Sequence, residues 1–191
     1  MPVEYFFPTP IYYDLLKDDD LLVSQTEIFN YLKHLNEHKL LNPWGDTVST
    51  TFKYGEYDQI LLSTPKFNDI IKTHCKNFLQ AYNITNNFYI KESWINISKK
   101  LDFQHFHIHD DFDLSGVYYY QTCGDDGDLV LKNPSLVNRF HVLTSKIDSS
   151  IFYKPEVGKL ILFPGFLEHA VYHNTTDNER ISVTFNVRIE R

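Results

Sequence analysis

The sequence is poor in cysteine, glycine and proline, and each scarcity excludes a class of protein. Only two cysteines occur among 191 residues, Cys75 and Cys123, and they form no CxxC pattern. Neither a disulfide framework nor a cysteine zinc site is therefore expected, and a reducing, cytoplasmic setting is the simplest interpretation. Seven glycines and eight prolines are too few for a collagenous or linker-rich chain.

Long apolar runs and excess positive charge are missing as well. No window reaches 18 uninterrupted apolar residues, and residues 1–10 lack the basic start of an export signal, so we expect neither a membrane span nor export. Acidic residues outnumber basic ones by 25 to 18, which gives a formal net charge of -7. Since such a chain has no general attraction for phosphate backbones, a nucleic-acid partner is not expected.

Aromatic residues are abundant and indicate a protein rich in β-structure. Tyrosine occurs 13 times and phenylalanine 15 times, and both pack well on a pleated surface. The hydrophobic fraction of 42% is enough for a sizeable core. Without a repeat or a flexible linker, the chain is expected to form one domain over residues 1–191.

The first half of the chain carries two helical patterns. Residues 4–13 are apolar but interrupted by prolines, which suits an edge strand. Apolar residues recur at helical spacing from Asp18 to about His38, after an acidic first turn. A second helix is predicted from Thr64 as the capping residue, with Pro65 in its first turn. Cys75 lies on the apolar stripe of this helix, so it is interpreted as a core residue and not as a nucleophile.

From residue 87 onward the pattern changes to short β-rich runs separated by Gly, Asp, Asn and Pro. The sequence therefore predicts a mainly β, α+β fold: a double-stranded β-helix, or jelly roll, with the N-terminal helices packed on one sheet. The predicted strands cover residues 88–98, 115–122, 127–134, 159–164 and 180–189.

Histidines cluster in a way that points to metal. His105, His107 and His109 alternate, so in an extended segment they project to one face. A fourth histidine, His169, follows the apolar run 159–164 and a turn. A single exposed histidine on a strand end is usually only solvated, but several imidazoles at one place favour a transition metal.

A polar row marks the last predicted strand. Arg180, Ser182, Thr184 and Asn186 alternate with Ile181, Val183 and Phe185. Such a row is usually the wet side of a sheet. If it points into a barrel instead, Arg180 becomes a buried cation that needs an anionic partner, which a dicarboxylate could supply through two hydrogen bonds.

These segments together resemble the Fe(II)- and 2-oxoglutarate-dependent oxygenases, in particular the prolyl-hydroxylase-like branch and its small phage and bacterial members. The resemblance rests on Gln104-x-x-His107-x-His109, on the following Leu114-Ser115-Gly116 strand, on His169 and on Arg180-x-Ser182. It implies a jelly roll that binds Fe(II), 2-oxoglutarate and O2 and couples decarboxylation of 2-oxoglutarate to succinate with oxidation, usually hydroxylation, of a substrate.

The resemblance also implies the ligands of the metal. His107 and His169 match the first and last ligand positions, and His109 is the preferred second ligand. The usual family motif is His-x-Asp, however, so a frame shifted by two residues with His109 first and Asp111 second stays open. His105 is expected to be exposed or to support a ligand, and neither His141 nor His173 matches a motif.

Other positions are implied to bind the cosubstrate or to line the site. Arg180 would pair with the distal carboxylate of 2-oxoglutarate, and Ser182, Tyr119 and Ser115 would donate hydrogen bonds to it. Site-lining roles are expected for Trp94, Asn96, Gln104 and Asn186.

The substrate and its class stay open at the level of sequence. A peptide or protein, an amino acid or another small molecule is expected, and no residue pattern decides the oligomeric state. Two alternatives come from other classes: a non-catalytic cupin-like metal-binding module, and a zinc hydrolase with three histidine ligands. Arg180 argues against the non-catalytic module, because a protein that only binds a metal does not need an arginine at that position of the strand.

Overall fold

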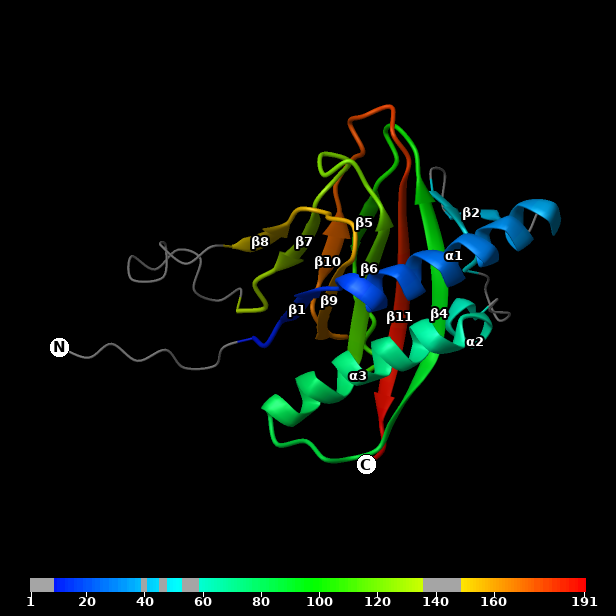
Figure 1. The fold of residues 1–191 in the computed structure, drawn as a ribbon. Helices are drawn as coiled ribbons and strands as arrows, with labels where there is room; N and C mark the ends of the chain where they lie inside the picture. Colours follow the sequence, from blue (N-terminus) through cyan, green and yellow to red (C-terminus); the bar gives the residue numbers. More distant parts are fainter. Residues whose placement is uncertain (1–8, 39–40, 45–47, 53–58, 136–148) are drawn as a thin grey trace.

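The computed structural model describes residues 9–38, 41–44, 48–52, 59–135 and 149–191. Two antiparallel sheets face each other, and helices cover the outer side of the larger one (Figure 1). The larger sheet has seven strands in the order β1-β9-β6-β11-β4-β3-β2, and the smaller has four in the order β5-β10-β7-β8. The prediction of a mainly β jelly roll with helices on one sheet is confirmed.

The strands predicted from the β-rich runs are all present, and further short strands join them. Of the edge strand predicted over residues 4–13, Tyr12 and Tyr13 belong to the edge strand β1, and residues 4–8 lie outside the described residues. The strands are β1 (Tyr12–Leu15), β2 (Asn42–Trp44), β3 (Val48–Thr50), β4 (Phe88–Ser98), β5 (Gln104–His107), β6 (Leu114–Gln121), β7 (Leu129–Lys132), β8 (Ser150–Tyr153), β9 (Lys159–Pro164), β10 (His169–Val171) and β11 (Arg180–Ile189).

The helices are α1 (Asp18–His38), the single turn α2 (Ile60–Ser63) and α3 (Pro65–Ala81). The two long helices lie side by side across the outer face of the larger sheet (Figure 1). Their apolar stripes and that face of the sheet form one core, in which Phe67 and Tyr118 pack with ring centroids 4.8 Å apart. Among the described residues, no helix is long and apolar enough to cross a membrane.

The start of α3 differs from the prediction in one detail. The hydroxyl of Thr64 donates to the carbonyl of Ile60 at 2.8 Å and makes no cap for α3. A carboxylate from the neighbouring helix takes that place, because Glu27 Oε2 accepts from the backbone N–H of Phe67 at 2.9 Å. A negative charge at a helix N-terminus satisfies its free N–H groups and complements its dipole, so this contact also ties α1 to α3.

Neither cysteine is paired, as predicted. Cys75 is fully buried in the core beneath α3, and burial raises the pKa of its thiol to about 12. Its thiol therefore stays protonated at neutral pH and cannot act as a nucleophile. Cys123 is exposed in the turn after β6.

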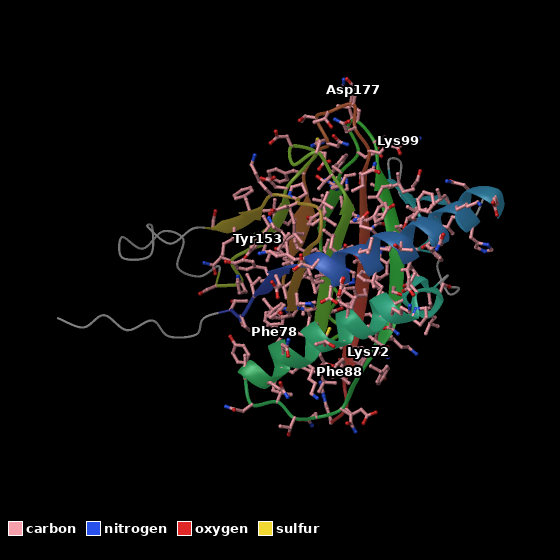
Figure 2. The ribbon with its side chains drawn as sticks, in the orientation of Figure 1. Lys72, Phe78, Phe88, Lys99, Tyr153 and Asp177 are labelled. Atoms are coloured by element: carbon pink, nitrogen blue, oxygen red, sulfur yellow. The ribbon has the colours of Figure 1, made fainter. Side chains whose placement is uncertain are left out.

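The ends of the central strands are tied together at one tip of the molecule. Figure 2 shows Lys99 and Asp177 there, one just after β4 and the other just before β11. The ammonium of Lys100 lies 2.8 Å from the Asp177 carboxylate, and that of Lys99 lies 3.7 Å from Glu179. These pairs are exposed and contribute little stability, but they lie where two paired strands leave the sheet.

Candidate metal centre

Three histidines converge between the two sheets. His107 ends β5, His169 begins β10, and the two residues are direct partners in the antiparallel pairing of these strands. His109 follows β5 by two residues. Each offers one ring nitrogen, and these three atoms all lie within 4.8 Å of one another. The structure therefore brings together the three residues that the resemblance selected.

The backbone holds the His109 segment against the turn before β10. The N–H of His109 donates to the carbonyl of Gly165 at 2.8 Å. A Cβ atom on Gly165 would lie 2.2 Å from the Phe112 carbonyl oxygen and 2.6 Å from that of His109. Only glycine permits this close approach, and it is what brings the loop after β5 beside His169.

Hydrogen bonds fix the rings of two of the three histidines. Nδ1 of His107 lies 2.7 Å from the carbonyl oxygen of His105, and Nδ1 of His169 lies 2.8 Å from that of Leu167. Because a carbonyl only accepts, each Nδ1 carries the proton and each Nε2 is the unprotonated nitrogen. A histidine that binds a metal typically has its other nitrogen hydrogen-bonded in this way.

Burial keeps the three imidazoles neutral. Desolvation lowers the pKa of His107, lowers that of His109 to about 4 and lowers that of His169 to about 3. The proximity of the rings to one another further lowers the pKa of His109 and His169. Neutral imidazoles are the form that binds a transition metal, so burial favours metal binding at this cluster.

No carboxylate of the described residues joins the cluster, and Asp111 is exposed in the turn before β6. The geometry thus favours the three-histidine arrangement over the shifted frame with Asp111. His105 and His173 are exposed, and both rings pack on Phe103, with His173 stacked at 4.3 Å between centroids. His141 lies outside the described residues.

His109 is linked to a buried carboxylate, that of Glu92, through the side chain of Asn186. Asn186 on β11 lies with its amide nitrogen 3.1 Å from Nδ1 of His109 and donates to Glu92 Oε2 on β4 at 3.0 Å. Its amide oxygen accepts from the hydroxyl of Ser115 on β6 at 2.8 Å. Three adjacent strands thus contribute one residue each to a support for His109.

Glu92 was not singled out from the sequence. The only signal was its place two residues before Trp94, on the same face of a predicted strand, and the pairing of Glu92 with Asn186 appears only once the strands are in register.

The histidines open into a small pocket between the sheets. Trp94 stacks on His109, with ring centroids 6.0 Å apart and an interplanar angle of 27°. Trp94, Asn96 and Gln104 were expected here and do line the pocket. The other residues that line it, besides the histidines, are Val117, Leu129, Val171 and Thr184.

Arg180 is buried on the same face of β11 as Thr184 and Asn186, farther along the strand. Its guanidinium donates to the backbone carbonyls of Asp126 and Gly127 and to the hydroxyl of Ser98 at 3.0 Å. A guanidinium has five N–H donors, so these contacts leave two for another partner. Among the described residues, no carboxylate forms an ion pair with it.

Two further candidates for cosubstrate binding lie near Arg180. Ser182 is its neighbour on the same face of β11, and Tyr119 of β6 is paired directly with Ser182. Tyr119 is fully buried, and burial raises the pKa of its phenol to about 12, so the hydroxyl stays a neutral donor. Ser115 lies farther along β6, in the support of His109.

Comparison with known proteins agrees with this geometry. Residues 92–186 match the model of a family described as "Putative 2OG-Fe(II) oxygenase", and this span runs from Glu92 through all three histidines to Asn186. This match places the segment that holds the three histidines in the 2OG-Fe(II) oxygenase superfamily. This superfamily uses Fe(II), 2-oxoglutarate and O2. No curated protein matches the sequence.

Solved structures share the fold at low sequence identity. A Pseudomonas putida prolyl-4-hydroxylase is 16% identical with a TM-score of 0.63, over 96% of this chain and 94% of that one. HygX from Streptomyces hygroscopicus, with nickel, 2-oxoglutarate and hygromycin B bound, is 12% identical with a TM-score of 0.61, over 94% and 83%. The 2-oxoglutarate-dependent epimerase SnoN from nogalamycin biosynthesis is 9% identical with a TM-score of 0.66, over 94% and 77%.

Proposed function

We propose that this chain is a non-haem Fe(II)- and 2-oxoglutarate-dependent dioxygenase in which His107, His109 and His169 hold the iron. The observation that carries the proposal is the convergence of three neutral imidazoles, two of them held in place by a hydrogen bond from Nδ1 to a backbone carbonyl. Imidazole nitrogen is a good ligand for iron, and the three rings leave positions open for other ligands. The chemistry of the donor set therefore fits the metal that the superfamily uses.

Iron, when bound, supplies the redox chemistry that joins O2 activation to decarboxylation of 2-oxoglutarate. The residues of the chain hold the ligands in place and shield the site from water. We propose that the outcome is hydroxylation of the substrate. The similarity to a prolyl-4-hydroxylase over 94% of that protein supports this, whereas the epimerase among the neighbours shows that the fold serves other outcomes too.

For the cosubstrate we propose Arg180, Ser182 and Tyr119 as the residues that bind its distal carboxylate. Arg180 is buried on the interior face of β11 and keeps two N–H donors beyond its contacts with Ser98 and with the carbonyls of Asp126 and Gly127. A buried guanidinium gains most from a carboxylate that it can bind through two hydrogen bonds. The hydroxyl of Ser115 is already donated to Asn186, so we assign Ser115 to the support of His109.

The substrate is proposed to be a peptide or protein, an amino acid or another small molecule, in a reducing, cytoplasmic setting. The net charge of -7 supports a partner other than nucleic acid. Two free cysteines are consistent with a reducing compartment.

The test is metal content combined with turnover. Protein purified without oxygen and loaded with Fe(II) is expected to hold one iron per chain. When O2 and a reductant such as ascorbate are then supplied, it should convert 2-oxoglutarate to succinate and CO2 slowly even without substrate. His107→Ala should abolish both signals. Iron binding without any succinate would favour a non-catalytic metal-binding module. Tight zinc binding with ester or amide hydrolysis and no succinate would favour the three-histidine hydrolase.

A further inference from the structure

Helix α1 carries two large apolar side chains that the fold leaves in contact with water. Leu22 is 65% exposed and Phe29 is 60% exposed. They are seven residues apart, which is about two helical turns, so they lie on one side of the helix. Another side of α1, which includes Ile28 and Leu35, packs in the core. Leu22 and Phe29 therefore form a second apolar stripe on α1, outside the core.

A hollow lies beside Phe29, between α1 and the ends of β6 and β11. Its apolar lining comes from Phe29 and Leu32 of α1, from Tyr120 of β6 and from Ile181 of β11. Figure 1 shows that these strand ends extend past α1 on the side away from α3. Because Phe29 belongs to both, the stripe and the hollow form one apolar surface, and surfaces of this kind mark interaction sites.

Charged residues lie at both ends of the stripe. Asp18 stands four residues before Leu22, and Lys33 stands four residues after Phe29, so all four fall on one side of α1. Asp18 and Lys33 are exposed, and neither forms an ion pair with another described residue. The order acid, apolar, apolar, base has the same spacing from either end. A reversed copy of the helix would therefore bring opposite charges together.

We propose that this stripe is the interface of a homodimer, in which the α1 helices of two copies pack antiparallel about a two-fold axis midway between Leu22 and Phe29. Leu22 of each copy lies opposite Phe29 of the other and enters the hollow beside it. Asp18 of each copy lies opposite Lys33 of the other. Packed helices have axes about 8–10 Å apart, which brings both kinds of pair within reach.

The charge pattern selects a second copy as the partner. A two-fold interface requires one patch to complement itself, and the order from Asp18 to Lys33 does so. A parallel pairing of the helices would instead set Asp18 against Asp18 and Lys33 against Lys33. The inference is independent of the proposed function, because α1 lies on the outer face of the larger sheet and the three histidines lie between the sheets.

The first experiment is sedimentation equilibrium of the full chain, at concentrations from about 1 μM to 1 mM. Wild-type protein should pass from monomer to dimer as the concentration rises. Leu22→Glu should weaken the dimer at least about tenfold, because the two-fold axis sets two carboxylates against phenylalanine rings. The control is Leu62→Glu, at a leucine of α2 that is 75% exposed and lies outside the stripe, and it should leave the dimer unchanged. A monomer at every concentration, or equal effects of the two variants, would overturn the proposal.

The second experiment exchanges the charges and tests the antiparallel arrangement. Asp18→Lys sets lysines against Lys33, and Lys33→Asp sets carboxylates against Asp18. Each variant alone should associate roughly 3- to 30-fold more weakly than wild type, because the two-fold axis repeats every like-charge contact. An equimolar mixture of the two variants restores opposite charges at both contacts and should form mixed dimers with about the wild-type affinity. Sedimentation of one fluorescently labelled variant measures this. If the mixture associated no better than either variant alone, the antiparallel dimer would be wrong.

Discussion

On one face of strand β11 the side chains from Ile181 to Val187 are apolar, and on the other face those from Arg180 to Asn186 are polar. Both faces are largely buried, with Phe185 and Asn186 each 0% exposed. The apolar face packs under α1 and α3, where burial of hydrocarbon stabilises the fold. The polar face looks into the space between the sheets, and its groups must find hydrogen-bond partners there.

The two faces of β11 therefore serve different purposes: the apolar face stabilises the fold, and the polar face carries the candidate site. The helix-covered side is a continuous apolar core. The inner side holds a smaller apolar cluster next to polar residues and the three clustered histidines. Changes on the first face should alter the free energy of unfolding and spare metal binding, while changes on the second should chiefly alter the binding of metal and cosubstrate.

The largest loss of stability is expected from Phe185→Ala. Phe185 is fully buried, and its ring fills the space above Gly116, where an added Cβ would lie 2.1 Å from the ring. Truncating such a phenylalanine typically costs about 3–5 kcal/mol. Urea denaturation of metal-free protein measures it, with the exposed Tyr89→Ala on the paired strand as control. If Phe185→Ala lost no more free energy of unfolding than Tyr89→Ala, the contrast between the two faces of β11 would be wrong. The same would follow if the folded fraction of Phe185→Ala no longer bound Mn(II).

Arg180→Ala tests the polar face through the cosubstrate. A charge-assisted, partly desolvated pair with the distal carboxylate should lose roughly 2–5 kcal/mol of binding. Arg180→Lys should rescue it only in part, because a point charge replaces the planar guanidinium. The measurement is the rise in melting temperature on adding 2-oxoglutarate to Mn(II)-loaded protein.

Arg180 also holds the loop after β6 through its contacts with the carbonyls of Asp126 and Gly127. The melting temperature without ligand is therefore expected to fall in Arg180→Ala, and the ligand-induced shift is the quantity to compare. An equal shift in wild type and variant would remove Arg180 from the cosubstrate site.

The ligand set is tested by comparing His109→Ala with Asp111→Ala. Loss of a direct ligand should weaken Mn(II) binding by more than about a hundredfold, since changes to groups that merely support ligands cost roughly 10–100-fold. Asp111 is exposed and outside the cluster, so its variant should bind Mn(II) as wild type does. The opposite result would restore the shifted frame with a carboxylate ligand. Titration followed by the electron paramagnetic resonance of free Mn(II) gives both affinities.

Asn186→Ala probes the support of His109 and should have a smaller effect. The variant leaves Ser115 and the buried carboxylate of Glu92 without their amide partner and frees the His109 ring to turn. A loss of roughly 10–100-fold in Mn(II) affinity is expected. Ser115→Ala keeps the contact to His109 and should lose less. Equal affinities for Asn186→Ala and wild type would show that the network does not orient the ring.

Periodicity in the sequence was enough to predict the two long helices, the longer strands and the apolar side of β11, whereas the grouping of His169 with His107 and His109 was implied by the family resemblance. Alternation showed that Arg180 and Asn186 share a face, but it could not show that this face points inward. The contacts that depend on register escaped prediction: Glu92 meets Asn186 only because β4 and β11 pair at that offset. The cap of α3 escaped for a similar reason, because Glu27 reaches it from another helix.

The pH dependence of the free energy of unfolding of metal-free protein tests the inner face of the sheet without a mutation, because the buried histidines lie on that side. Burial holds the pKa of His109 at about 4 and that of His169 at about 3, whereas a histidine in the unfolded chain titrates near 6.5, at roughly its ordinary value. Between these values the unfolded state binds more protons than the folded state, so stability rises with pH across this window. Above a pH of about 6.5 both histidines are neutral in either state, and their contribution to the free energy of unfolding is at its most favourable. This contribution is lost progressively as the pH falls toward about 4 and then 3.

Urea denaturation at several pH values across this window measures the slope. The double variant His109→Gln/His169→Gln removes both groups and should give a shallower loss on acidification than wild type. His173→Gln, at an exposed histidine, should leave the slope unchanged. Parallel slopes for wild type and the double variant would mean that the buried histidines do not resist protonation, and the inner face of the sheet would then be more accessible to water than its packing implies.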